Sequence, residues 1–159
     1  VDENWAIGYR NSLLISIPQD MRFFRETTGG KVVVMGRKTL ESFPGGNPLK
    51  NRVNIVLTSN PDYTKEGVTI VHNLEELKEV LKPYDSDDVF VIGGGSIYSL
   101  LLPLCSTAYI TRIKKAFDAD TYFPDLDLSA EWEISDVSDD YEYEGISYSF
   151  AVYKKSYAH

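Results

Sequence analysis

Hydrophobic and polar residues follow a pattern along the chain that predicts alternating strands and helices. Short runs rich in Val, Ile and Leu predict strands at residues 31–35, 53–57, 68–71, 89–92 and 108–113. Apolar residues at helical spacing predict helices at residues 17–28, 37–42, 73–81 and 95–102. Toward the end of the chain, apolar and polar residues alternate as in an antiparallel strand pair, at residues 132–137 and 146–153.

Two of the helices begin at capping-box patterns, Ser16 with Gln19 and Asn73 with Glu76. Helices that alternate with continuously apolar strands predict an α/β fold whose sheet is covered on both faces. We expect one domain over residues 1–159, in three layers (α/β/α), with a mostly parallel central sheet and an antiparallel C-terminal edge. The chain opens without methionine, so we expect only the last residues of the first strand to be present.

The composition is that of a globular protein with one core. The sequence is 43% hydrophobic, and no apolar run approaches the roughly 20 residues that cross a bilayer. We therefore expect a soluble protein with no signal peptide and no membrane partner. A single cysteine, Cys105, forms no internal disulfide, and with His72 and His159 it makes no metal-ligand pattern, so we expect a reducing cytoplasm and no metal.

The charge is distributed unevenly along the chain. The net charge of −8 argues against nucleic acid as a partner, because phosphate backbones are bound through accumulated Lys and Arg. Residues 1–60 nevertheless carry a balance of +3, against −11 for residues 61–159. A small anionic ligand would therefore be attracted to the first part of the chain.

One acid lies where burial should be costly. Asp20 comes three residues after Ile17 and four before Phe24, so it shares the apolar face of the first helix. A buried carboxylate in a cleft is a candidate for binding a cationic or amide-like ligand and for proton chemistry. The alternative is an acid at a helix start that only complements the helix dipole.

Two strand-to-helix junctions have features of phosphate-binding turns. Gly36 is followed by two cations and a hydroxyl, Arg37, Lys38 and Thr39, which suit a diphosphate. The second junction is the glycine run at residues 93–95, although Tyr98 stands where a Rossmann fingerprint needs its third glycine. Each junction alone could be a solvated turn, whereas together they suggest an extended ligand with more than one phosphate.

These residues resemble dihydrofolate reductase of the bacterial, chromosomal type, and the resemblance extends over essentially the whole chain. The matching motifs are VD at 1–2, AIG at 6–8, IPQD at 17–20, VMGRKT at 34–39, ES at 41–42, RVNIVL at 52–57, IGGGSIY at 92–98 and DTYFP at 120–124. The resemblance implies a sheet of about eight strands, NADPH as the cofactor, dihydrofolate as the substrate and a monomeric enzyme of one-carbon metabolism.

The resemblance also implies roles for particular residues. Asp20, partnered by the hydroxyl of Thr111, would be the catalytic acid that binds the pterin and promotes protonation at N5, while NADPH delivers hydride to C6. The implied substrate-binding residues, with Arg52 as the clamp on the glutamate carboxylate, are Asp20, Met21, Phe24, Arg25, Phe43, Leu49, Arg52, Ile92 and Thr111. The implied NADPH-binding residues are Ala6, Ile7, Ser12, Leu13, Gly36, Arg37, Lys38, Thr39, Leu57, Thr58, Ser59, Ile92, Gly94, Gly95, Ser96, Ile97, Tyr98 and Thr121. The peptide bond between Gly93 and Gly94 would be cis.

The chain departs from the family pattern at one place near the acid. Ile15 replaces a tryptophan whose indole helps to hold an active-site water, and isoleucine cannot donate a hydrogen bond. Ser96 also stands where some members carry a basic residue near the 2′-phosphate. Three hypotheses follow: a dihydrofolate reductase, a pyrimidine reductase of riboflavin biosynthesis with the same fold, and a non-catalytic module that binds folate or nucleotide.

Overall fold

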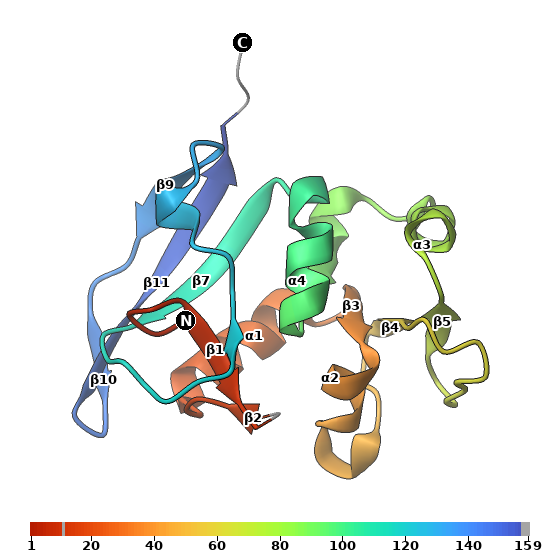
Figure 1. Ribbon diagram of the computed structural model, residues 1–159, viewed down its shortest axis with the longest axis horizontal. Helices are drawn as coiled ribbons and strands as arrows, with labels where there is room; N and C mark the ends of the chain where they lie inside the picture. Colours follow the sequence, from red (N-terminus) through yellow and green to blue (C-terminus); the bar gives the residue numbers. More distant parts are fainter. Residues whose placement is uncertain (11, 157–159) are drawn as a thin grey trace. The chain divides into compact units, whose positions relative to one another are not determined.

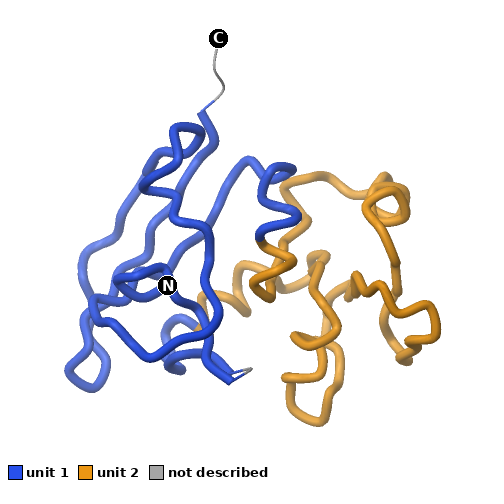
Figure 2. Tube along the Cα trace, in the orientation of Figure 1, with its two compact units in different colours: residues 1–20, 99–159 blue, residues 21–98 orange. Residues whose placement is uncertain are grey.

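The computed structural model describes residues 1–10 and 12–156. These residues form two compact units (Figure 2). Unit 2 is the continuous segment 21–98, and unit 1 combines residues 1–20 with the described residues from 99 onward. Each unit is described by itself.

Unit 2 contains a four-stranded parallel sheet in the order β5-β4-β3-β6; β3, β4 and β5 are labelled in Figure 1. The strands are β3 (Val32–Gly36), β4 (Val53–Leu57), β5 (Thr69–Val71) and β6 (Val89–Val91). Val34 of β3 pairs with Ile55 of β4 and Val91 of β6, which fixes the register at the middle of the sheet. The parallel part of the predicted sheet is thus confirmed, and the bounds of β4 match the prediction at both ends.

Helices cover both faces of this sheet. The short helix α2 (Arg37–Glu41) places Leu40 in a buried cluster with Val33, Met35 and Val56. On the alternate positions of β3, Gly36 faces Ile97 of helix α4 (Gly95–Leu101), so α4 lies against the opposite face. The remaining helical segments of unit 2 are most of α1 (Pro18–Thr28), α3 (Leu74–Leu81), η1 (Pro44–Gly46) and η2 (Ser86–Asp88).

Unit 1 contains antiparallel strands in two hydrogen-bonded sheets. The first sheet, ordered β2-β1-β8, consists of β1 (Ala6–Tyr9), β2 (Ser12–Leu13) and β8 (Thr121–Tyr122). In the second, ordered β10-β11-β7 with β9 also on β11, the strands are β7 (Thr107–Ile113), β9 (Trp132–Val137), β10 (Tyr141–Tyr143) and β11 (Ile146–Lys155). The predicted pairing of the last two apolar-alternating segments is confirmed. A first strand was expected without bounds, and β2, β8 and β10 were not predicted from their sequences.

Aromatic side chains and polar anchors hold unit 1 together. Trp5 lies 6.2 Å from Phe123 and 5.8 Å from Tyr153 between ring centroids. The Tyr153 hydroxyl donates to Asp127, at the middle of the 3-10 segment η4 (Leu126–Leu128). A second anchor is the buried carboxylate of Asp2, which accepts the backbone N–H groups of Asn4, Ala6 and Phe117.

The two capping boxes differ from the prediction in instructive ways. Helix α1 (Pro18–Thr28) begins at Pro18, so the predicted box of Ser16 and Gln19 is wrong. Proline suits the first helical position because its missing N–H would have no partner there. The second box is largely confirmed, because Asn73 accepts the N–H of Glu76 at 2.8 Å. The Glu76 carboxylate, however, accepts the N–H of His72, one residue before the cap.

The helices α1 and α4 carry the chain from one unit to the other, since the unit boundaries fall after Asp20 and before Ser99. After α4, the 3-10 segment η3 (Leu102–Leu104) contains Pro103, which cannot continue a regular helix. Within the described part of the chain, no helix combines the length and apolar character needed to cross a membrane.

Candidate active site

The junctions that follow β3, β4 and β6 leave the parallel sheet of unit 2 at the same edge, because neighbouring parallel strands end on the same side. The predicted junctions after β3 and β6 are direct neighbours. The N–H of Gly36 donates to the carbonyl of Gly93 at 2.9 Å. The structure therefore joins two segments that appear as separate turns in the sequence, and Thr58 with Ser59 follows the neighbouring strand β4 at the same end of the sheet.

Glycines allow the two neighbouring junctions to approach at backbone distance. The Gly93-Gly94 peptide is cis, as predicted, and Gly93 has a φ of +120°, which L side chains rarely adopt. A Cβ atom on Gly36 would lie 3.0 Å from the side chain of Ile97. A Cβ atom on Gly94 would lie 3.5 Å from the hydroxyl of Thr39. Glycine at position 36 therefore lets the side chain of Ile97 on α4 pack close to the end of β3, while Gly94 lies at ordinary contact distance from Thr39.

Of the two cations at this edge, Arg37 is held by an ion pair. Arg37 donates to both carboxylate oxygens of Glu41 at 3.0 Å, one helical turn along. Both side chains are partly exposed, so this ion pair is weak and can be exchanged for a more highly charged anion. Lys38 and Ser96 are exposed, and Thr39 is half-buried. The donor set suits a phosphate group better than a neutral ligand.

Arg52 is oriented by neighbours within unit 2. Its Nε donates to the Thr28 hydroxyl at 2.9 Å and its Nη1 to the Lys50 carbonyl at 3.0 Å. The guanidinium also lies 5.9 Å from the centroid of the Phe24 ring. These two partners are neutral oxygens, so they orient the guanidinium without neutralising its positive charge. The group can therefore still form an ion pair with an anion such as a carboxylate.

The apolar residues predicted around the substrate are half-buried in unit 2. Phe43, Leu49 and Ile92 pack against the buried cluster of β3, β4 and α2. Met21 and Phe24 lie on α1 and are also half-buried, whereas Arg25 is exposed. These side chains combine support from the core with remaining accessible surface, as the wall of a ligand site requires.

Asp20 and Thr111 meet within unit 1. The Thr111 hydroxyl on β7 donates to Asp20 Oδ1 at 2.6 Å, across 91 residues of sequence. Asp20 is half-buried, and Ile17 one turn earlier is only 1% exposed. The acid therefore lies at the border of an apolar environment and has a fixed partner, which favours the functional interpretation over a helix-end acid that only complements the dipole.

The predicted cofactor residues of unit 1 gather on its first sheet. Gly8 of β1 lies opposite both Leu13 of β2 and Thr121 of β8. Ala6 is 1% exposed, Ile7 is half-buried, and Ser12 and Leu13 are exposed.

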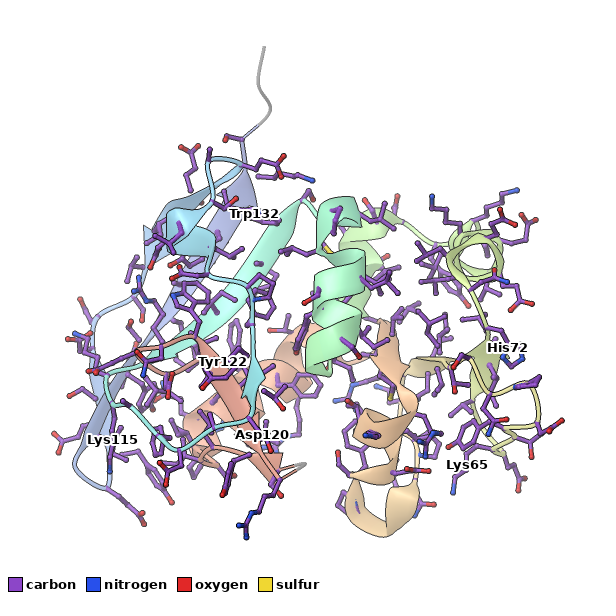
Figure 3. All side chains as sticks on the ribbon, in the orientation of Figure 1. Lys65, His72, Lys115, Asp120, Tyr122 and Trp132 are labelled. Atoms are coloured by element: carbon purple, nitrogen blue, oxygen red, sulfur yellow. The ribbon has the colours of Figure 1, made fainter. Side chains whose placement is uncertain are left out.

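Asp120, labelled beside β8 in Figure 3, connects this sheet with the segment after β1. It accepts the backbone N–H of Arg10 and the hydroxyl of Thr121, each at 2.9 Å. These two hydrogen bonds, that from Arg10 first, hold the pKa of the Asp120 carboxyl below its usual value. An ionised Asp120 therefore links the ends of β1 and β8.

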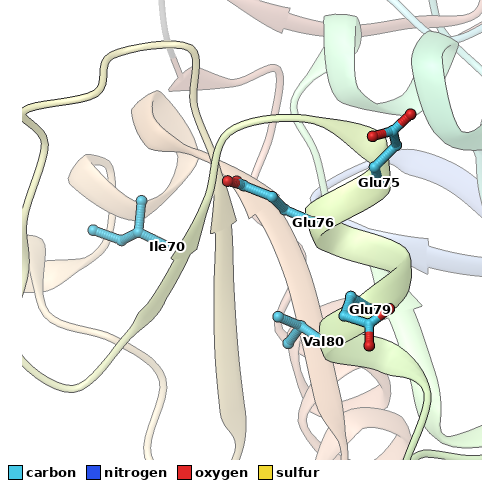
Figure 4. A pocket seen from close by; sticks show the side chains of 5 residues that line it. All are labelled: Ile70, Glu75, Glu76, Glu79 and Val80. Carbon is cyan, nitrogen blue, oxygen red and sulfur yellow. The ribbon is translucent and has the colours of Figure 1, made fainter.

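An open depression of about 470 Å³ lies elsewhere in unit 2, between β5 and α3 (Figure 4). Its lining contains two apolar and three acidic residues, Ile70, Val80, Glu75, Glu76 and Glu79. None of the predicted site residues belongs to this lining, and its carboxylates would repel a phosphate or a carboxylate ligand. Among residues 1–10 and 12–156, no group of three His, Cys, Asp or Glu side chains is placed to hold a metal ion; His159, considered as a ligand from the sequence, lies outside these residues.

One feature beside the acid could not be found from the sequence. The hydroxyl of Tyr148 on β11 donates to the side-chain oxygen of Gln19, the residue before Asp20, at 2.5 Å. The alternating pattern of residues 146–153 placed Tyr148 on a strand, but only the strand register brings it to the start of α1.

Comparison with known proteins identifies the family. A sequence model of the family described as dihydrofolate reductase matches residues 1–155. The chain is 37% identical over 154 residues to dihydrofolate reductase of Bacillus subtilis, covering 93% of this chain and 89% of that one. It is 40% identical over 131 residues to dihydrofolate reductase of Haemophilus influenzae, covering 82% and 78% of the two chains. A solved structure of dihydrofolate reductase from Enterococcus faecalis, complexed with NADP(H) and RAB-propyl, superposes with a TM-score of 0.85 at 37% identity, covering 97% of this chain and 91% of that one. The sequence motifs, the fold and these comparisons agree, and the chain belongs to the dihydrofolate reductase family.

Proposed function

We propose that Asp20, held by Thr111, binds the pterin of dihydrofolate and promotes protonation at N5 during NADPH-dependent reduction to tetrahydrofolate. The NADPH-dependent oxidoreductase activity itself follows from the family. The observation that carries the proposed role is the 2.6 Å hydrogen bond from the Thr111 hydroxyl to Asp20. A hydroxyl that donates to one carboxylate oxygen leaves the other to accept from an amino group and a ring N–H of the substrate.

The substrate end that carries the glutamate would be bound in unit 2. Arg52 is oriented through its hydrogen bonds to Thr28 and Lys50, so little side-chain entropy remains to be lost when a carboxylate binds. The half-buried apolar wall supplies surface for the flat rings of the substrate, through Met21, Phe24, Phe43, Leu49 and Ile92.

The residues of the parallel sheet edge fit NADPH. Glycines at the ends of β3 and β6 would let the backbone of these junctions approach a diphosphate, and Arg37, Lys38 and Thr39 would bring charge and a hydroxyl to it. Thr58 and Ser59 are the residues we assign to the 2′-phosphate. Bound NADPH supplies the hydride that adds to C6 of the substrate.

The protein's own contribution to the chemistry is the proton at N5. Reduction of the N5–C6 double bond adds a hydride at C6 and a proton at N5, and the carboxylate raises the tendency of N5 to take that proton. Ile15 supplies no hydrogen-bond donor in place of the family's indole. We therefore assign the orientation of Asp20 to hydroxyl groups of unit 1, beginning with Thr111.

The Asp20→Asn variant tests this role. Turnover, followed as NADPH oxidation with dihydrofolate, should fall by about 10²- to 10⁴-fold, because general acid–base groups typically contribute that much. The loss should be larger at higher pH, where free substrate is unprotonated, while NADPH affinity should be unchanged. Asp136→Asn, on an exposed part of β9, is the matched control.

Three measurements discriminate between the hypotheses. Unchanged turnover in Asp20→Asn would remove Asp20 from the mechanism. Faster oxidation of NADPH with the pyrimidine substrate of riboflavin biosynthesis than with dihydrofolate would favour that reductase instead. Tight binding of NADPH and dihydrofolate without turnover would indicate the non-catalytic module.

We also propose that the enzyme acts as a monomer in the cytoplasm. One cysteine allows no internal disulfide, as suits a reducing compartment. Burial raises the pKa of the Cys105 thiol, which therefore stays protonated and unreactive. Sedimentation equilibrium at micromolar concentration should give the mass of one chain, and a dimer mass would contradict the proposal.

A further inference from the structure

Two hydrogen bonds leave one face of the β7–β11 ladder and reach consecutive residues of α1. Thr111 pairs with Phe150, and Ile113 pairs with Tyr148, two residues along each strand, so Thr111 and Tyr148 share a face. From this face, the Thr111 hydroxyl donates to Asp20 and the Tyr148 hydroxyl donates to Gln19. All of these residues belong to unit 1.

The Tyr148 ring is fixed by aromatic neighbours. It is 2% exposed, and its centroid lies 5.8 Å from the Tyr141 ring and 5.7 Å from the Phe150 ring, the latter edge-to-face. A buried tyrosine hydroxyl needs a polar partner, and here the side chain of Gln19 provides it. Packing of the ring therefore fixes the position of the hydroxyl. The exposed side chain of Gln19 is the group that loses conformational freedom in this hydrogen bond.

The acid and the tyrosine also influence each other electrostatically. Burial raises the pKa of Tyr148, and the negative charge of Asp20 raises it further, with a smaller contribution from Tyr141. Tyr148 is consequently a neutral hydroxyl, able to donate, at neutral pH and beyond the ordinary tyrosine pKa of 10.0.

We propose that Tyr148, acting through Gln19, is a positioning residue for the Asp20 carboxylate. This inference rests on the proposed role of Asp20. Gln19 precedes Asp20 in the first turn of α1, where backbone N–H groups lack intrahelical partners and the helix start is prone to fray. The bond to β11 ties this turn to the same strand pair that carries Thr111, so the acid and its hydroxyl partner keep one geometry.

The hydrogen bond itself can be observed directly, because Gln19 is the only glutamine in the sequence. Protein labelled with 15N in glutamine side chains should give a single pair of side-chain amide signals. We expect these signals to shift in Tyr148→Phe, which removes the hydroxyl, and to remain at the parental position in Tyr141→Phe. Tyr141 is a suitable control because it packs in the same aromatic group and is 40% exposed.

The kinetic test is a double-mutant cycle on hydride transfer. Tyr148→Phe and Gln19→Met should each slow hydride transfer by about 2- to 10-fold, which is the net contribution expected of one hydrogen bond between neutral groups. The double variant should be no slower than either single variant, because both remove the same bond. NADPH affinity should be unchanged in all three, and Tyr141→Phe should keep the parental rate.

Several results would overturn the inference. Parental hydride transfer in Tyr148→Phe, or additive effects in the double variant, would each contradict a positioning role. If Tyr148→Phe fails to fold, Gln19→Met decides the question alone, because the Gln19 side chain is exposed. A parent that does not reduce dihydrofolate would reject the proposed function together with this inference. An active parent that is impaired by Asp20→Asn but unaffected by Tyr148→Phe would reject this inference only.

Discussion

The two units differ in what fills their cores. In residues 21–98, all of which are described, the buried hydrophobic side chains are aliphatic, such as Val33, Met35 and Leu40. In unit 1 the buried side chains include five aromatic residues, Trp5, Phe123, Trp132, Tyr148 and Tyr153. Strands of a parallel sheet that is covered on both faces favour small branched side chains, whereas antiparallel strands leave room for rings.

The two cores position functional groups in different ways. The aliphatic core of unit 2 supports the backbone turns after its strands, and its side chains need only close packing because they carry no polar atoms. The aromatic core of unit 1 carries hydroxyls, and those of Tyr148 and Tyr153 must find partners. The aromatic packing of unit 1 therefore orients polar contacts, one of which, from Tyr148, reaches Gln19 beside the acid that Thr111 holds.

The largest effect on stability should come from the aliphatic core. Leu40→Ala removes a side chain with 0% exposure and should lower the free energy of unfolding by about 3 kcal/mol. Urea unfolding should be followed by far-UV circular dichroism and by tryptophan fluorescence. Both tryptophans, Trp5 and Trp132, belong to unit 1, so fluorescence reports on that unit alone.

A single domain over residues 1–159 remains a prediction, and the same variant tests it. If the units unfold cooperatively, the substitution in unit 2 should move both transitions equally. A shift of the dichroism transition without a shift of the fluorescence transition would show two independently unfolding units. Leu128→Ala, at a position that is 85% exposed, should leave both transitions in place.

The next effect concerns the polar anchor of unit 1. Asp2→Asn places an amide where the carboxylate accepts three backbone N–H groups, so we expect a loss of about 2 kcal/mol. The fluorescence midpoint in urea measures it, with the exposed Asp118→Asn as the control. Equal midpoints for the two variants would show that unit 1 depends on its rings and not on this anchor.

A smaller effect is expected from one aromatic hydroxyl. Tyr153→Phe removes the donor to Asp127 and should cost about 1 kcal/mol at neutral pH. Burial, followed by the hydrogen bond to Asp127, raises the pKa of Tyr153 well above its ordinary value of 10.0.

The raised pKa gives this prediction a pH signature. The folded state holds the tyrosine proton more tightly than the unfolded state, so its contribution is complete below pH 10 and is lost as the pH rises through the folded pKa. The parent should therefore lose stability above pH 10 more steeply than Tyr153→Phe does. Parallel pH profiles of the urea midpoint would contradict the assignment.

The smallest expected effect is a gain in stability. Glu144 and Gly145 form the two-residue turn between β10 and β11, and Glu144 has a φ of +50°. Asparagine tolerates this conformation better, so Glu144→Asn should stabilise the protein by about 0.5 kcal/mol. A small rise in the thermal midpoint would be the supporting result, and a fall would show that the glutamate has a role beyond the turn.

The sequence predicted unit 2 well because its structure is local. Continuous apolar runs identified β3 to β6, and β4 was predicted with its observed bounds. The short strands of unit 1 have no such signal. Gly8 pairs with Thr121 across the length of the chain, and the Glu-Gly turn of β10 lacks the Asn-Gly or Asp-Gly signature of hairpins.

The candidate site likewise contains features that local sequence indicates and features that depend on distant pairing. The place of Asp20 on an apolar helix face made it a candidate, its role was implied by the family resemblance, and the glycine junctions were recognised from the residues themselves. The bond between Tyr148 and Gln19 joins residues 129 positions apart, so it depends on a register that no local pattern encodes.

Asp20 is synthesised early, whereas the strands that carry Thr111 and Tyr148 are synthesised late. Asp20 precedes its hydroxyl partner by 91 residues, and the strand that carries Tyr148 lies near the end of the described chain. On the ribosome, the continuous segment 21–98 can assemble its sheet while the chain still lacks β7 and β11. The parallel sheet with its glycine junctions can thus be complete first, and the carboxylate acquires its geometry only when the last strands have been added.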